Sequence, residues 1–154
     1  MRDEKYIIDL CDKVLGYEAR RQRRFDFLKG DKAEKIKENG KSVIKNVMKE
    51  AGVRLPVDAY YEELNLVIEY HERQHFQPVG FFDNRMTCSG VPRGEQREIY
   101  DNRRRKRLAE NDICLIELSY TDFNYRNSGK LMRDKNDISI IRDKLSKFLN
   151  KQNY

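Results

Sequence analysis

The chain has 154 residues, of which 38% are charged, and it carries a net charge of +6 with an isoelectric point near 9.2. This length predicts one domain, spanning residues 1–154, with a core of its own. The positive charge favours an acidic partner such as nucleic acid, and the lack of a long apolar run argues against a membrane-spanning helix. The charged N-terminus and three cysteines without metal-ligand spacing are typical of a cytoplasmic protein.

The N-terminal third of the chain predicts a helix, a strand and a second helix. Asp3 can cap the first helix, which has apolar residues at helical spacing through Leu15 and can end at Gly16. Residues 17–28 change to an alternating pattern, which predicts a strand that is basic on one face. Over Ser42–Ala51 the apolar residues fall on one side of a helix, and we expect this helix to be an insertion.

Two alternating segments follow and predict a β-hairpin. Apolar residues occupy every second position over residues 53–61 and again over 64–70. Directly opposed residues of a hairpin share a face, so burying both apolar sets places Asp58, Glu69 and His71 together on the other face. Like charges at close range are unfavourable unless a cation or a proton separates them. The arrangement therefore suggests a divalent-metal site.

The rest of the chain predicts a long loop, a helix, a strand and a last helix. The prolines and glycines of residues 76–94 exclude one regular element there. Residues 95–110 are helical in pattern and rich in arginine, residues 113–118 predict a short apolar strand, and a C-terminal helix can begin at Asp137. Without the insertion the order is α-β-β-β-α-β plus a C-terminal helix, an α/β fold with a mixed central sheet flanked by helices.

The segment from His71 to His75 reads HERQH and matches the HExxH signature of zinc peptidases. That chemistry needs both histidines on one face of a helix, with Glu72 as general base for a zinc-bound water. The preceding residues alternate as a strand and Pro78 follows closely. A zinc metallopeptidase is therefore the less favoured interpretation.

The segments that contain Asp58 and Glu69 resemble a different class of enzyme. The string PVD, ten further residues and then EYH resembles the catalytic signature of the PD-(D/E)XK nuclease superfamily. VIEYHERQHF is similar to the IEYDGEQHF segment of its branch of very-short-patch-repair-like and other small phage and bacterial endonucleases. EIYDNRRRKRLAENDICLIEL, with Asp101 and Arg104, is similar to the helix and strand that follow there. His71 stands where the superfamily has lysine, and His71-Glu72 replace the Asp-Gly of that branch.

The resemblance implies a restriction-endonuclease-like core and a magnesium-dependent DNA endonuclease of restriction, mobile-element or repair type. Manganese would be a substitute metal. Asp58 and Glu69 would hold the ion, with the main-chain carbonyl of Tyr70 as a further ligand. Because one site cuts one strand, cleavage of both strands would need a homodimer or two binding events.

The resemblance also implies the groups that handle the attacking water. His71 would position or deprotonate it, His75 is a second candidate, and Gln74 could orient either ring. Glu18, near the end of the first helix, could complete the site or could be an ordinary exposed acid.

Substrate contacts are expected from basic residues of the arginine-rich helix, namely Arg97, Arg103, Arg104 and Arg105, on the phosphates. Base readout is expected from the Phe76–Gly94 loop and the inserted helix at Ser42–Ala51. An alternative is a nucleic-acid-binding protein that keeps the fold but has weakened catalysis, because the usual lysine is absent.

Overall fold

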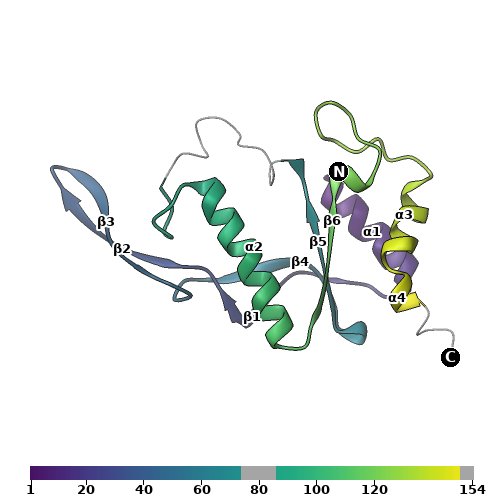
Figure 1. Ribbon diagram of the computed structural model, residues 1–154, viewed down its shortest axis with the longest axis horizontal. Coiled ribbons are helices and arrows are strands. Elements are labelled where there is room, and N and C mark those ends of the chain that lie inside the picture. The colour runs from purple at the N-terminus through teal and green to yellow at the C-terminus, as the bar shows by residue number, and fades with distance from the viewer. Residues whose placement is uncertain (74–85, 150–154) are drawn as a thin grey trace. The chain divides into compact units, whose positions relative to one another are not determined.

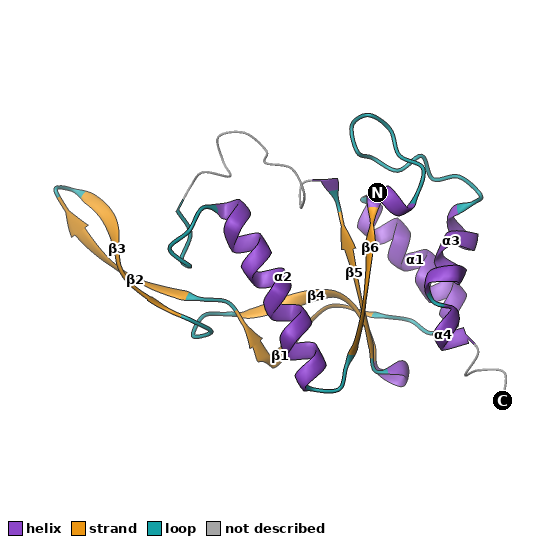
Figure 2. Cartoon of the chain, viewed as in Figure 1, coloured by secondary structure: helices purple, strands orange, loops and turns teal. Residues whose placement is uncertain are grey.

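The computed structural model describes residues 1–73 and 86–149. It is an α/β structure with a mixed sheet and helices (Figures 1 and 2), as the sequence predicts. None of the helices in these described ranges has the length and apolarity needed to cross a membrane. The chain forms two compact units, a first unit of Met1–Arg23, Val57–Phe76 and Asp112–Tyr154 and a second unit of Arg24–Pro56 and Gln77–Asn111.

The elements wholly within the first unit are α1 (Asp3–Leu15), β5 (Leu66–His71), β6 (Cys114–Ser119), α3 (Asp137–Lys144) and α4 (Ser146–Leu149). Strands β1 (Arg20–Lys29) and β4 (Arg54–Tyr61) each contribute residues to both units. The four-stranded sheet has the order β1-β4-β5-β6, with β5 antiparallel to β4 and parallel to β6. This register is central to the site, because it sets which side chains of β4, β5 and β6 are neighbours.

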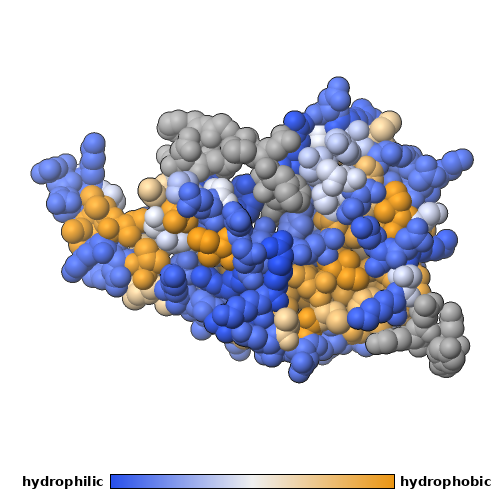
Figure 3. All heavy atoms as spheres, viewed as in Figure 1, coloured by the Kyte–Doolittle hydropathy of each residue, from blue (hydrophilic) through white to orange (hydrophobic). Residues whose placement is uncertain are grey.

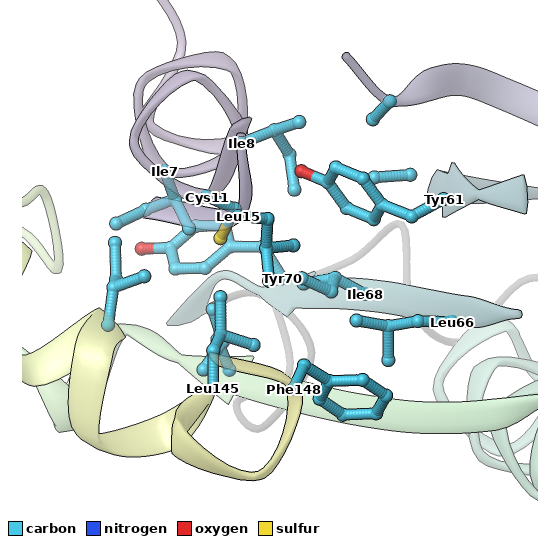
Figure 4. Close-up of a cluster of buried hydrophobic side chains, with 14 of the residues drawn as sticks. Ile7, Ile8, Cys11, Leu15, Tyr61, Leu66, Ile68, Tyr70, Leu145 and Phe148 are labelled. Carbon is cyan, nitrogen blue, oxygen red and sulfur yellow. The ribbon is translucent and has the colours of Figure 1, made fainter. Parts of the chain in front are cut away.

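The core of the first unit lies between α1, the strands and the C-terminal helices (Figure 4). Its large, fully buried side chains include Ile7, Leu15, Tyr61, Ile68 and Leu145. Each such apolar side chain stabilises the fold by about 1.5–3 kcal/mol relative to an exposed one. The predicted first helix and both hairpin strands are confirmed. Burial follows the apolar spacing in α1 and alternates along β4, whereas all six residues of β5 are buried.

Two details of the first unit differ from the sequence predictions. Asp3 does not cap α1 but is its first residue, and its Oδ2 accepts a hydrogen bond from the N–H of Leu131 at 2.9 Å. The C-terminal helix is broken at Leu145 into α3 and α4. The tight turn between β4 and β5 is a single 3₁₀ turn, η1 (Glu62–Leu64), closed by Asn65 with φ of 50°.

The elements wholly within the second unit are β2 (Lys32–Glu38), β3 (Lys41–Met48) and α2 (Arg93–Glu110). The predicted helix over Ser42–Ala51 is wrong, because this segment forms β3, paired antiparallel with β2. Asn39 and Gly40 join the two strands with φ of 51° and 77°. Two successive residues with positive φ make the turn that best matches the twist of a hairpin, and Asn-Gly is its preferred sequence.

The β2–β3 hairpin buries little apolar surface. Ile36 and Val43 lie opposite each other across the two strands, yet 43% and 38% of their surfaces are exposed. Figure 3 shows apolar atoms among hydrophilic ones on this hairpin. Because most of this surface is exposed, burial contributes little to the choice of a strand here. The strand is favoured by the local preference of β-branched residues and by cross-strand packing.

Candidate active site

Asp58 and Glu69 lie side by side where the ladder between β4 and β5 ends. The last ladder pair toward them is Ala59 opposite Ile68, which makes Asp58 and Glu69 the next opposed pair. The backbone N–H of Asp58 donates to Oε2 of Glu69 at 3.2 Å, and the backbone N–H of Tyr70 donates to Oδ2 of Asp58 at 2.8 Å. Each carboxylate therefore takes the place of a backbone carbonyl on the opposite strand, and the two acids are fixed close together.

His71 shares the face of β5 that carries Glu69, two residues earlier. Its Nε2 lies 2.8 Å from Oε1 of Glu117, and only 7% of the surface of His71 is exposed. Glu117 belongs to β6 and is opposite Glu69 in the parallel register. The structure thus brings Asp58, Glu69 and His71 together, as the alternation predicts, and adds Glu117 as the group that orients the imidazole.

Helix α1 supplies another carboxylate, that of Glu4. Burial raises the pKa of Glu4, and the negative charges of Asp58 and Glu72 raise this pKa further. The charge of Arg2 opposes the rise. Gln22 of β1 also opposes it, by donating a hydrogen bond from Nε2 to Oε1 of Glu4 at 3.1 Å. The helix carboxylate near Asp58 is therefore Glu4, whereas Glu18 lies beyond the end of α1 and is exposed.

The backbone at Gln22 is unusual, because its φ is 54° within strand β1. Left-handed φ is uncommon for residues other than glycine, and it costs roughly 1–2 kcal/mol. The side chain of Gln22 nevertheless contacts Glu4 and lines the same cavity as Asp58. Backbone strain of this kind is often found at functional sites.

A cavity of about 400 Å³ gives access to this cluster in the first unit. The residues that line it are Arg2, Glu4, Lys5, Ile8, Arg21, Gln22 and Asp58. Both acidic and basic side chains line it, and Lys5 and Arg21 already form ion pairs with Asp9. The carboxylates of Glu4 and Asp58 could therefore receive a cation there.

The donor set at Asp58 and Glu69 fits magnesium. This ion takes oxygen ligands, and in proteins it is commonly held by one or two carboxylates, with waters and substrate phosphates completing the shell. A cation between Glu4 and Asp58 would also relieve the repulsion that Glu4 experiences from Asp58. Among the described residues there is no group of three or more His, Cys, Asp or Glu side chains that could hold a metal ion. The protein would thus supply only part of the coordination shell.

The HERQH motif does not form a zinc-peptidase helix at its first residues. His71 ends strand β5 and Glu72 follows it outside any helix. Both histidines of HExxH must lie on one face of a helix to bind one zinc ion. His75 and Gln74, predicted as further catalytic residues, lie outside the described residues.

The arginines predicted to contact DNA belong to α2 in the second unit. Arg103 forms an ion pair with buried Asp31 at 2.8 Å, and 10% of its side chain is exposed. Arg104 bonds Asp101 and the carbonyl of Pro56, both at 3.2 Å. Arg103 and Arg104 thus have structural contacts within this unit.

The other predicted residues of α2 are more accessible. Arg105 is exposed and donates to Oδ1 of Asn102 at 2.6 Å. Arg97 is partly exposed. These two arginines are better placed than Arg103 to reach a ligand from solvent, because less of their surface is covered.

Glu117 and Glu4 are the site residues that the sequence analysis missed. Glu117 had a detectable signal, since it is the single acid in the apolar run ICLIEL, where a charge needs a partner. Glu4 had none, because an acid in the first turn of a helix is common for electrostatic reasons alone.

Searches of protein-family models, of curated proteins and of solved structures find no match to this chain.

Proposed function

We propose that this protein is a magnesium-dependent DNA endonuclease with the restriction-endonuclease-like fold of the PD-(D/E)XK superfamily. The observation that carries the proposal is the mutual hydrogen bonding that fixes Asp58 beside Glu69 on adjacent antiparallel strands. The order of elements also supports it. With the β2–β3 hairpin set aside, the chain runs α1-β1-β4-β5-α2-β6, the α-β-β-β-α-β order expected for this core.

Asp58 and Glu69, with the main-chain carbonyl of Tyr70, would hold the magnesium ion. When bound, the ion supplies Lewis-acid activation of a water and stabilises charge on the scissile phosphate. The backbone hydrogen bonds to both carboxylates keep these ligands in place before substrate arrives. Little reorganisation is then needed, which is the basis of electrostatic catalysis.

His71 is the group that would accept a proton from the attacking water. We assign the donor role in the bond with Glu117 to Nε2, which would leave Nδ1 as the nitrogen that accepts the proton. The pair therefore selects one tautomer and one ring orientation. Histidine can in this way do the work that lysine does elsewhere in the superfamily.

Cleavage of supercoiled plasmid with magnesium tests this function. Asp58→Asn and Glu69→Gln keep the size of each side chain and remove its charge, so we expect each to slow cutting about 100-fold or more. Glu63→Gln, at an exposed position in the turn between the two strands, is the matched control and should cut like the parent. Equal cutting by all four proteins would refute the assignment.

A second candidate is a nucleic-acid-binding protein of the same fold without catalysis. It is favoured by His71 in place of lysine and by the lack, within the described ranges, of a complete group of metal-holding side chains. A parent protein that binds duplex DNA tightly but leaves it intact with magnesium and with manganese would identify this candidate.

We propose that the β2–β3 hairpin contributes to the choice of DNA sequence. This hairpin is formed by the segment in which an inserted helix was expected. Residues 32–49 contain six lysines and two glutamates, and the major groove of DNA admits a two-stranded ribbon. The Phe76–Gly94 loop remains the other proposed source of base contacts. Its residues Asn84 and Arg85 lie outside the described residues.

A further inference from the structure

The first unit has a second and larger cavity, of about 700 Å³. It is formed by the start of the chain, by the residues just after β5, and by the loop that precedes α3. The lining residues are Met1, Arg2, Asp3, Glu72, Arg73, Arg126, Ser128, Gly129, Lys130, Leu131, Met132 and Arg133. Five of these side chains are basic and two are acidic, so the cavity carries an excess of positive charge.

Two of the basic side chains are held in the cavity wall by the protein itself. Arg133 forms an ion pair with Asp3 at 3.0 Å and stacks on the ring of Tyr6, 5.0 Å from its centroid. Arg73 donates to the carbonyl of Asn127. These contacts account for one of the two acids and fix the shape of the wall.

The remaining basic groups are the ones that can receive a ligand. Within residues 1–73 and 86–149, Arg126 and Lys130 make no ion pair with an acidic side chain, whereas the charge of Arg2 acts on Glu4. Arg126 and Lys130 are exposed. They lie across one turn from each other, because the N–H of Arg126 donates to the carbonyl of Lys130 at 2.8 Å. Ser128, between them, adds a hydroxyl group to the same rim.

The turn that carries these groups is packed in a way that only glycine permits. Gly129 has φ of 88°, and a Cβ atom on it would lie 2.7 Å from Cδ of Arg73. The turn therefore rests directly on the stem of Arg73. This close packing holds Arg126 and Lys130 over the cavity instead of leaving them on a loose loop.

The large cavity is next to the candidate active site. Arg2 lines both this cavity and the smaller one that contains Asp58. We propose that the large cavity binds a phosphate group of the nucleic-acid strand, on a nucleotide next to the one at Asp58 and Glu69. The inference rests on the proposed nuclease function for its substrate. The ligand chemistry follows from the basic groups alone, since arginine, lysine and serine side chains are the usual donors to phosphate.

Binding of a fluorescent single-stranded oligonucleotide, measured by anisotropy with EDTA present, tests the proposal without cleavage. The double variant Arg126→Gln/Lys130→Gln should weaken binding about tenfold, as expected for the loss of charged hydrogen bonds. It should also reduce the slope of log K against log salt by about 0.7 for each phosphate that the variant no longer binds. The control Lys135→Gln/Arg142→Gln removes the same charge from exposed positions outside the cavity and should change both quantities less.

The phosphate group in the cavity could be an internal phosphodiester or a terminal phosphate. Oligonucleotides with and without a 5′-phosphate distinguish these two. An equal loss of affinity with both oligonucleotides identifies an internal phosphodiester, and a loss confined to the phosphorylated one identifies a terminal phosphate.

Equal weakening by the two double variants would overturn the proposal. Thermal denaturation checks that both are folded. A parent protein that binds through this cavity but never cuts would refute the nuclease function alone, so the two failures are distinguishable.

Discussion

Asp31 is a buried acid of the second unit, and its charge is balanced by Arg103. The two side chains are 3% and 10% exposed and their charged atoms are 2.8 Å apart. Burial alone would raise the pKa of Asp31. Hydrogen bonds from Ser89, from the backbone of Glu50 and from Arg103 outweigh it and hold this pKa below its ordinary value.

A carboxyl group with a lowered pKa in the folded state stabilises the fold above its unfolded pKa of about 4. This contribution is lost as the pH falls through the folded pKa. We predict that Asp31→Asn lowers the free energy of unfolding by about 3 kcal/mol at neutral pH, because it leaves Arg103 buried without its partner. Urea denaturation should show the parent and the variant converging at acid pH, below the ordinary pKa of an aspartate.

The exposed acid Asp26 provides the control, since its pair with Arg54 lies at the surface and such pairs contribute little. Asp26→Asn should change stability by less than about 1 kcal/mol at either pH. A loss in Asp31→Asn that is the same at both pH values would contradict the prediction.

Individual residues also show which members of the candidate site can be identified from one sequence. Asp58, Glu69 and His71 were predictable because strand alternation fixes which side chains share a face. Glu4 was not, because its neighbours are brought to it by the packing of α1, which no local pattern encodes. Arg103 has the composition of a phosphate contact, but its partner Asp31 is revealed only by the fold.

At the scale of elements, prediction succeeded where apolar residues are buried at a regular spacing. Helix α1 and strands β4 and β5 all contribute to one core. Burial imposes the period of α1 and β4, while β5 is buried along its whole length. The β2–β3 hairpin has no such constraint, and Val43, Ile44, Val47 and Met48 happen to match helical spacing. The Asn39-Gly40 pair was the more reliable signal there, because turn geometry acts locally.

The hairpin should therefore depend on its turn. We predict that Gly40→Val destabilises the β2–β3 pairing, because valine at φ of 77° is strained by roughly 1–3 kcal/mol. Hydrogen exchange of the β2 and β3 amides should speed up, while the amides of β5 and β6 keep their protection.

Lys41→Val is the matched control for this change. It introduces the same side chain one residue later, at the first position of β3, where a β-branched residue is favoured. Its hairpin amides should exchange no faster than those of the parent. Unchanged exchange in Gly40→Val would show that the turn does not determine the pairing.

At the scale of the whole molecule, the net charge of +6 does not show which basic groups are available to a ligand. Several of the 32 lysines and arginines are used internally. Arg21 bonds Asp9 and Asp12, and Arg107 bonds Glu50 at 2.6 Å. The composition favours an acidic partner, and the folded structure shows which basic groups are already paired with acidic side chains.

We predict that affinity for duplex DNA falls steeply with salt, with a slope of log K against log salt of about −0.9 for each phosphate contacted. Anisotropy titrations at several salt concentrations measure this slope. Unrelated sequences should give similar slopes, because phosphate contacts carry no sequence information. An uncharged peptide-nucleic-acid duplex is the control and should not bind. Affinity that is independent of salt would contradict an electrostatic contact with DNA.

The left-handed backbone at Gln22 has a consequence for how this chain would respond to directed evolution. Glycine tolerates that φ with less strain, but it cannot reach Glu4 with an amide group. Rounds of selection for heat tolerance alone should enrich glycine at position 22, whereas rounds that also demand the proposed nuclease activity should retain glutamine. Position 22 is where these two selection regimes are expected to diverge.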